Sequence, residues 1–177
     1  MATSTPRQRA EAIVVFESMF GNTATVATEI AQALAATGLS VEATEAQRVE
    51  PAFLQGRRLV VLGAPTHGFA LPRTLSRRAA GVALRPGMRE LLTALGGFAA
   101  PLPAVAAFDV RSAPGTWPTS VAAQLVRRLR RKGAVTVLGT HSFHVARQAG
   151  PLVSGDRERA TAWARALARQ LERHGEG

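Results

Sequence analysis

The part of this chain that most constrains its fold is the stretch from residue 12 to residue 27. Ile13 to Phe16 is a short apolar run rich in β-branched residues, typical of a strand buried on both faces. Ser18 to Asn22 is a polar turn with one glycine. From Thr23 the apolar residues fall on one helical face: Val26, Ala27, Ile30, Ala31 and Leu34. The stretch therefore predicts a β-strand that runs through a tight turn into an α-helix.

A strand, a turn of small residues and a helix form a geometry that binds phosphate. The first backbone N–H groups of a helix have no partner within the helix, and the helix dipole adds partial positive charge there. Gly21 lets the backbone turn sharply, and the hydroxyls of Ser18 and Thr23 can add hydrogen bonds. The turn is neither a GxxxxGK[ST] loop nor a GxGxxG loop. It is a candidate phosphate site, and an ordinary turn with Asn22 or Thr23 as the helix N-cap remains the alternative.

Apolar runs of strand length alternate with segments of helical period along the whole chain. Strands are expected at 12–16, 41–44, 58–64, 104–108 and 134–138, with residues 142–145 extending the last strand or pairing with it. Helices are expected at about 23–36, from 86–87 to 95, from Thr119 or Ser120 to Gly133, and around 160–171, with a single turn at 51–54 and a surface excursion at 70–85. The pattern predicts an α/β three-layer sandwich with a five-stranded parallel sheet, in the order 2-1-3-4-5. We expect a flexible tail at 1–11 and a single domain at 12–175.

Three loops should converge at one edge of this sheet. In an open parallel sheet the ligand lies outside the carboxyl ends of the strands, at the switch point of the topology. The sequence places Ser18–Thr23, Pro65–Phe69 and Asp109–Pro118 at those ends. A ligand site formed by the three loops is therefore expected.

The residues of these loops resemble those of a known family. Val15 to Ala27 is similar to the FMN-phosphate signature of flavodoxins, with an aromatic at the strand end, a serine two positions later and then Gly-Asn-Thr. Gly63 to Phe69 resembles their second flavin-contacting loop, and Phe108-Asp109-Val110-Arg111 stands where their third loop begins. The chain is most similar to short bacterial flavodoxin-like proteins, which share Ser-Met-Phe-Gly-Asn-Thr, Pro-Thr-His, Phe-Asp-x-Arg and a late Gly-Pro-Leu, here Gly150 to Leu152.

The resemblance implies that the chain binds FMN through these three loops. The implied contacts are Ser18, Met19, Phe20, Gly21, Asn22, Thr23, Pro65, Thr66, His67, Gly68, Phe69, Asp109, Val110 and Arg111. Many flavodoxins have hydroxyl residues at the positions of Met19 and Phe20, so these two would contact the phosphate only through their backbone. The third loop lacks the usual aromatic, and Trp117 replaces it only if the loop folds back.

Within that site, single residues have both a functional and a structural interpretation. His67 or Phe69 would cover one face of the flavin ring, or else simply pack within the turn. Asp109 would disfavour an anionic reduced flavin and Arg111 would favour it, unless the two pair with each other as a structural contact. The sequence leaves both questions open.

Composition narrows the function. The chain has no cysteine, and no carboxylate cluster accompanies His141 and His144, so no metal site is expected. No apolar run approaches the ~20 residues that span a membrane, so a cytoplasmic location is expected. The net charge is +10, and the basic runs, such as 127–132, are either solvated helix faces or a surface for an acidic partner. Aromatics for base stacking are absent from these runs, so no specific nucleic acid is expected.

The sequence thus favours an FMN-binding electron carrier with an acidic redox partner protein. An FMN-dependent NAD(P)H:quinone-type reductase is the enzymatic alternative, because the bare third loop leaves room for a second substrate. A binding module that kept the fold and lost the flavin is the non-redox alternative. Whether the chain is an enzyme, and whether it is a monomer or a dimer, is not decided by the sequence.

Overall fold

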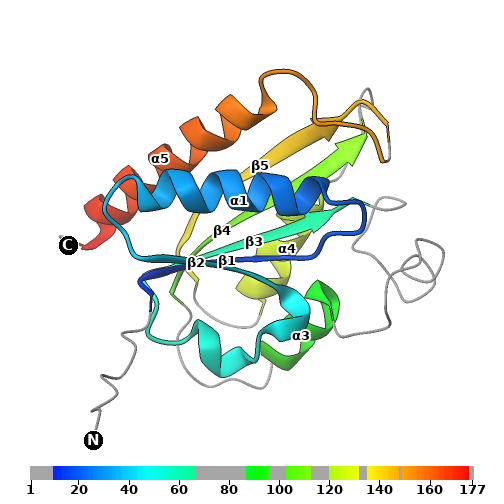
Figure 1. The fold of residues 1–177 in the computed structure, drawn as a ribbon. Helices are drawn as coiled ribbons and strands as arrows, with labels where there is room; N and C mark the ends of the chain where they lie inside the picture. Colours follow the sequence, from blue (N-terminus) through cyan, green and yellow to red (C-terminus); the bar gives the residue numbers. More distant parts are fainter. Residues whose placement is uncertain are drawn as a thin grey trace, which may run out of the picture.

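The centre of the molecule is a five-stranded sheet in which every pair of neighbours is parallel (Figure 1). The computed structural model describes residues 10–66, 87–95, 103–112, 120–131, 135–147 and 149–175. The strands are β1 (Ala12–Phe16), β2 (Val41–Glu45), β3 (Leu59–Pro65), β4 (Ala104–Ser112) and β5 (Val137–Val145). Their order is β2-β1-β3-β4-β5, which confirms the predicted topology.

Helices cover both faces of the sheet. In Figure 1, α1 (Asn22–Ala35) and α5 (Asp156–Gly175) lie on one face, and α3 (Met88–Ala94) and α4 (Val121–Arg130) lie on the other. Two short 3-10 helices, η1 (Ala46–Arg48) and η2 (Pro51–Leu54), follow β2, and η2 is the predicted single turn. None of the helices in the described ranges is long and apolar enough to cross a membrane.

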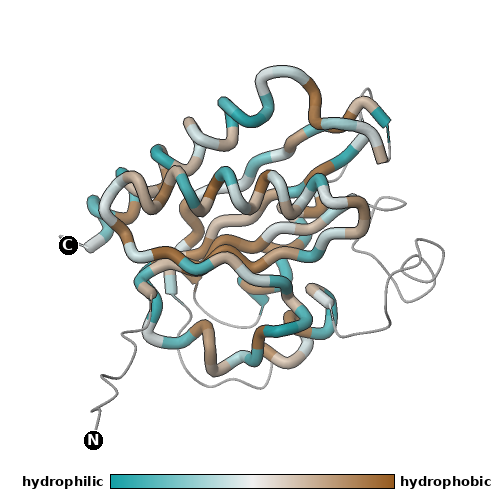
Figure 2. Tube along the Cα trace, in the orientation of Figure 1, coloured by the Kyte–Doolittle hydropathy of each residue, from teal (hydrophilic) through white to brown (hydrophobic). Residues whose placement is uncertain are grey.

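Alternation along the strands divides the interior into two cores. In β1, Ala12 and Val14 pack toward α1 and α5, whereas Ile13 and Val15 pack toward α3 and α4. Because successive strand residues point to opposite faces, a central strand has apolar residues at every position. Figure 2 shows this as brown strands between helices that carry teal segments.

The last two strands are longer than the sequence indicated. The fourth strand was predicted to end at Phe108, but β4 continues to Ser112. Asp109 to Arg111 therefore lie in the strand and not in a loop. The reason is pairing on both sides, because β3 pairs with β4 as far as Val110 and β5 pairs with it as far as Ser112. Residues 142–145 belong to β5 itself, which is one strand from Val137 to Val145.

The start of α1, beside the predicted ligand site, differs from the expectation. The N-cap of α1 is Gly21, in the left-handed region with φ 86°, and not Asn22 or Thr23. Ser120 caps α4 as predicted, because its hydroxyl accepts a hydrogen bond from the backbone N–H of Ala123 at 3.2 Å.

Near the N-terminus, Glu11 was expected to belong to the flexible tail, but it forms hydrogen bonds with Ser40. The surface excursion expected at 70–85 lies outside the described residues.

The absence of a side chain at Gly63 makes room for the buried ring of Phe108. A Cβ on Gly63, in β3, would overlap the ring of Phe108, its partner on β4. We expect Gly63→Ala to destabilise the fold by roughly 1–3 kcal/mol or more, because a packed core yields little to an inserted methyl group. Unfolding in urea measures the loss.

Gly139→Ala is the matched control, because a Cβ on this β5 glycine would make only ordinary contacts, at 3.6 Å from Trp163 and 3.9 Å from Leu167. Equal stability losses in the two variants would contradict this explanation.

Candidate functional site

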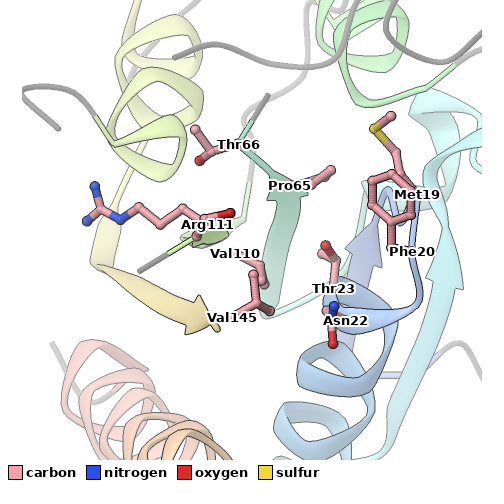
Figure 3. Close-up of a pocket in the computed structure, with 10 residues that line it drawn as sticks. Met19, Phe20, Asn22, Thr23, Pro65, Thr66, Val110, Arg111 and Val145 are labelled. Carbon is pink, nitrogen blue, oxygen red and sulfur yellow. The ribbon is translucent and has the colours of Figure 1, made fainter. Parts of the chain in front are cut away.

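A pocket opens at the carboxyl edge of the sheet, where the sequence placed the ligand. It contains about 380 Å³ of space, part of it open to solvent, between the start of α1 and the ends of β3, β4 and β5 (Figure 3). Its lining combines apolar and hydroxyl side chains with one amide and one arginine: Met19, Phe20, Asn22, Thr23, Pro65, Thr66, Val110, Arg111, Ser112 and Val145. The turn between β1 and α1 therefore meets residues from the second and third predicted loops.

The turn before α1 is folded around the side chain of Ser18. Its Oγ accepts hydrogen bonds from the backbone N–H groups of Gly21, at 3.1 Å, and Ala24, at 3.3 Å. The N–H groups of Asn22 and Thr23 have no partner among the described residues. Two of the free donors at the N-terminus of α1 are thus satisfied by the protein, and two are left for a ligand or water.

Two hydroxyl groups in the pocket have no partner among the described residues, and that of Thr66 is itself buried. Thr23 has only 2% of its surface exposed, and its hydroxyl has no partner in the described part of the chain. The Oγ1 of Thr66 is also buried without a partner, while its backbone N–H is held by the carbonyl of Val110 at 2.8 Å. A buried polar group without a hydrogen bond costs about 1–3 kcal/mol. Both hydroxyls are therefore suited to bind a polar ligand.

The side chain of Asn22 bonds to the protein itself, whereas a side chain that anchors phosphate would be free to reach the ligand. Its Nδ2 donates to the backbone carbonyl of Gly150 at 2.8 Å, in the turn that follows β5. Asn22 lines the pocket, but its carboxamide is engaged by the protein. The Gly-Pro-Leu segment that begins at Gly150 is thereby joined to the start of α1.

Asp109 lies beneath the pocket and not at its surface. It is fully buried, and its Oδ2 accepts hydrogen bonds from the hydroxyl of Ser120, at 2.7 Å, and the N–H of Ala122, at 3.0 Å. Its Oδ1 faces Arg111, with 3.8 Å between the oxygen and the Nε atom. The structural pairing of Asp109 with Arg111 is thus the arrangement present, and Asp109 also holds the start of α4.

The remaining predicted residues divide between the pocket wall and the undescribed segments. Met19 and Phe20 line its rim, and 41% of the surface of Phe20 is exposed. Pro65, Val110 and the stem of Arg111 line the interior (Figure 3). His67, Gly68, Phe69 and Trp117 lie outside the described residues.

Sequence reasoning did not name two lining residues, Ser112 and Val145, although Ser112 lies in the range 109–118 that was expected at this edge. They are partners in the register of β4 and β5, so the signal was the length of these strands.

The histidines on β5 lie apart from this pocket. His141 packs against Phe143, at 4.6 Å between ring centroids, and Trp163, at 5.7 Å. Burial lowers the pKa of His141 below its usual value, because the charged imidazolium loses hydration. Within the described residues, no three groups that ligate metals come together.

Comparison with known proteins points to one family. A family model described as Flavodoxin matches residues 14–96. No curated protein sequence matches the chain. Among solved structures, oxidised Flavodoxin 2 from Bacillus cereus is similar with 21% identity and a TM-score of 0.70, over 91% of this chain and 99% of that one.

Two further flavodoxin structures show the same likeness. The flavodoxin of Streptococcus pneumoniae TIGR4 has 19% identity and a TM-score of 0.66, over 90% of this chain and 98% of its own. The two-electron reduced flavodoxin of Megasphaera elsdenii has 21% identity and a TM-score of 0.59, over 89% and 98%. At these identities the structures show a shared fold.

The hydroxyl of Ser18 should stabilise the protein even without a ligand. Ser18→Ala removes the acceptor for two backbone N–H groups, and we expect it to lower the free energy of unfolding by about 1 kcal/mol. Urea unfolding of the cofactor-free protein measures the effect. Ser112→Ala, at an exposed residue of the same pocket, is the control and should stay within about 0.5 kcal/mol of the parent. A Ser18→Ala variant as stable as this control would contradict the capping role.

Proposed function

We propose that this chain, which matches a Flavodoxin family model over residues 14–96, binds FMN at the carboxyl edge of its sheet and exchanges electrons with a redox partner protein. The observation that carries the proposal is the start of α1, where Asn22 and Thr23 line the pocket and their backbone N–H groups and the hydroxyl of Thr23 have no partner among the described residues. When bound, the flavin supplies the redox chemistry, since none of the described side chains carries a redox group.

The phosphate end of FMN is assigned to the turn before α1. The free N–H groups of Asn22 and Thr23 point to the same end of the helix, where the dipole favours an anion. Ser18 accepts two N–H bonds through its oxygen and keeps its own O–H to donate. Thr23 adds the second hydroxyl donor, so the turn offers hydrogen bonds without a cation of its own.

The ring end is assigned to the opposite side of the pocket. Pro65 and Val110 offer apolar surface for the ring, and the unpaired hydroxyl of Thr66 offers a hydrogen bond to its polar edge. His67 to Phe69 remain part of this proposal on the strength of the sequence. The exposed Phe20 lies at the rim, so the pocket opens where a partner can approach.

The partner is proposed to be acidic. The chain carries a net charge of +10, and Arg127 and Arg130 on α4 and Arg131 at its C-cap are exposed. A field of this sign attracts anionic proteins and speeds their encounter at low ionic strength.

Removing one hydroxyl tests the phosphate site. Thr23→Val keeps the size and burial of the side chain but loses a hydrogen bond to a charged group, which is worth about 1.5–3 kcal/mol. We expect FMN to bind roughly tenfold to a hundredfold more weakly, while riboflavin, which has no phosphate, binds nearly as before. Titration followed by flavin fluorescence gives both dissociation constants.

Thr28→Val is the matched control, because that hydroxyl is exposed and bonds to a backbone carbonyl within α1. If the unaltered protein retains no FMN and binds none on titration, the proposed function is wrong.

The sign of the protein's field can be tested with small oxidants. Reoxidation of the reduced, FMN-loaded protein by ferricyanide, an anion, should slow as ionic strength rises, because screening removes the attraction. A cationic cobalt complex should show the opposite trend. Stopped-flow absorbance measures both rates, and equal salt dependences would argue against an acidic partner.

A further inference from the structure

We infer that the turn after β5 is a supporting wall behind the phosphate site, and that Asn22 is the positioning residue that ties the phosphate-binding turn to it. The wall comprises residues 146–147 and 149–152, whereas the phosphate signature contains only residues at the start of α1. This inference rests on the FMN site proposed above and assigns a role to the Gly-Pro-Leu segment.

The first step is the direction of the Asn22 side chain. Its Nδ2 donates to the carbonyl of Gly150 at 2.8 Å, across 128 positions of sequence, in a partly buried place. Asn22 is also the first residue of α1, so its own backbone N–H is one of the free donors for phosphate. A bond that fixes this residue from the side fixes the direction of that donor. The carboxamide therefore acts through the backbone, and phosphate is bound by its neighbours.

The second step is that the turn is itself held in place. The segment that leaves the turn runs back along the end of β5, where Leu152 forms an antiparallel bridge with Val145. Backbone bonds run from Ala146 N–H to Pro151 O at 3.1 Å and from Gly150 N–H to Arg147 O at 2.8 Å. A tether transmits position only if its far end is fixed, and these bonds fix it.

The turn is anchored again where α5 begins. Buried Asp156 accepts the backbone N–H of His144 through Oδ2 at 2.6 Å, and its other oxygen holds the side chain of Arg159. In Figure 1 the turn leaves the end of β5 and lies beside the N-terminal end of α1. Val145, the residue at which it starts, lines the pocket. The supporting wall therefore adjoins the described site at Val145, and its own described residues lie behind the pocket lining.

Gly150 allows the wall to be disturbed without touching Asn22. A Cβ on Gly150 would lie 3.0 Å from the backbone N of Arg147 and 3.2 Å from its Cβ, so a side chain there forces the turn to shift. Gly150→Val should displace the carbonyl that Asn22 binds. Asn22→Ala removes the donor of the same bond.

A double-mutant cycle on FMN and riboflavin affinity tests the inference. We expect Asn22→Ala and Gly150→Val each to weaken FMN binding by about fivefold to tenfold, the worth of one hydrogen bond. Riboflavin should bind within about twofold of the parent in both, because the site affected is the phosphate's. The double variant should be no weaker than the worse single variant, because both changes break one contact. Gly175→Val, where an added Cβ meets nothing within 4 Å, is the control for a valine at a glycine.

Three results would overturn the inference. Multiplying losses in the double variant, or unchanged FMN affinity in Gly150→Val, would mean that Asn22 binds phosphate directly. Equal losses for FMN and riboflavin would mean that the bond only supports the fold. If Gly150→Val does not fold, as judged by thermal unfolding, Gly150→Ala takes its place with the same outcomes. Failure of the unaltered protein to bind FMN is a separate result, which removes the proposed function itself.

Discussion

The parallel pairing of β1 with both of its neighbours is the constraint on which the rest of this structure depends. Every residue of β1 has a partner in β2 and in β3, so the chain must cross over the sheet each time it returns. All strands then end at one edge, and each connection starts there. The pairing of β1 with β3 continues one residue beyond the end of β1, where the backbone N–H of Glu17 donates to the carbonyl of Gly63 at 2.9 Å. The turn that begins at Ser18 therefore leaves from a fixed point next to β3.

Local sequence was enough to predict the parts of the fold that depend on periodicity. The apolar run of β1 and the helical face of α1 follow from spacing that each segment carries in itself, and the strand order follows from the alternation of strands and helices together with right-handed crossovers. The end of β4 could not be found in that way. Asp109 has the character of a loop residue, and it stays in the strand because Ser120 and Ala122, more than ten positions later, supply its hydrogen bonds. The partner of Asn22 was beyond local reasoning for the same reason.

The case of Asp109 also shows how a residue beside a ligand site can serve the fold. A buried carboxylate is costly unless it is hydrogen-bonded, and here its Oδ2 is bonded at the first residues of α4. That contact joins the end of β4 to the start of α4, so both ends of their connection are held close to the pocket. The Nε of Arg111 lies 3.8 Å from Oδ1, an ion pair in which neither atom has a hydrogen-bond partner among the described residues. Asp109 and Arg111 thus support the wall of the pocket. The sequence alone had left open a second role, in which the two residues tune the flavin.

The start of α1 shows a division of hydrogen bonds between stability and binding. Ser18 takes the N–H groups of Gly21 and Ala24, while those of Asn22 and Thr23 are left without partners in the described structure. A helix with all of these donors capped would be more stable and would have nothing to offer an anion. The hydroxyl of Thr23, which lines the pocket, also has no partner among the described residues. A ligand phosphate would accept these hydrogen bonds, and by linkage a ligand at a hundred times its dissociation constant adds about 2.7 kcal/mol of stability. The donors left unpaired at this turn are therefore the structural reason that the fold would favour being occupied.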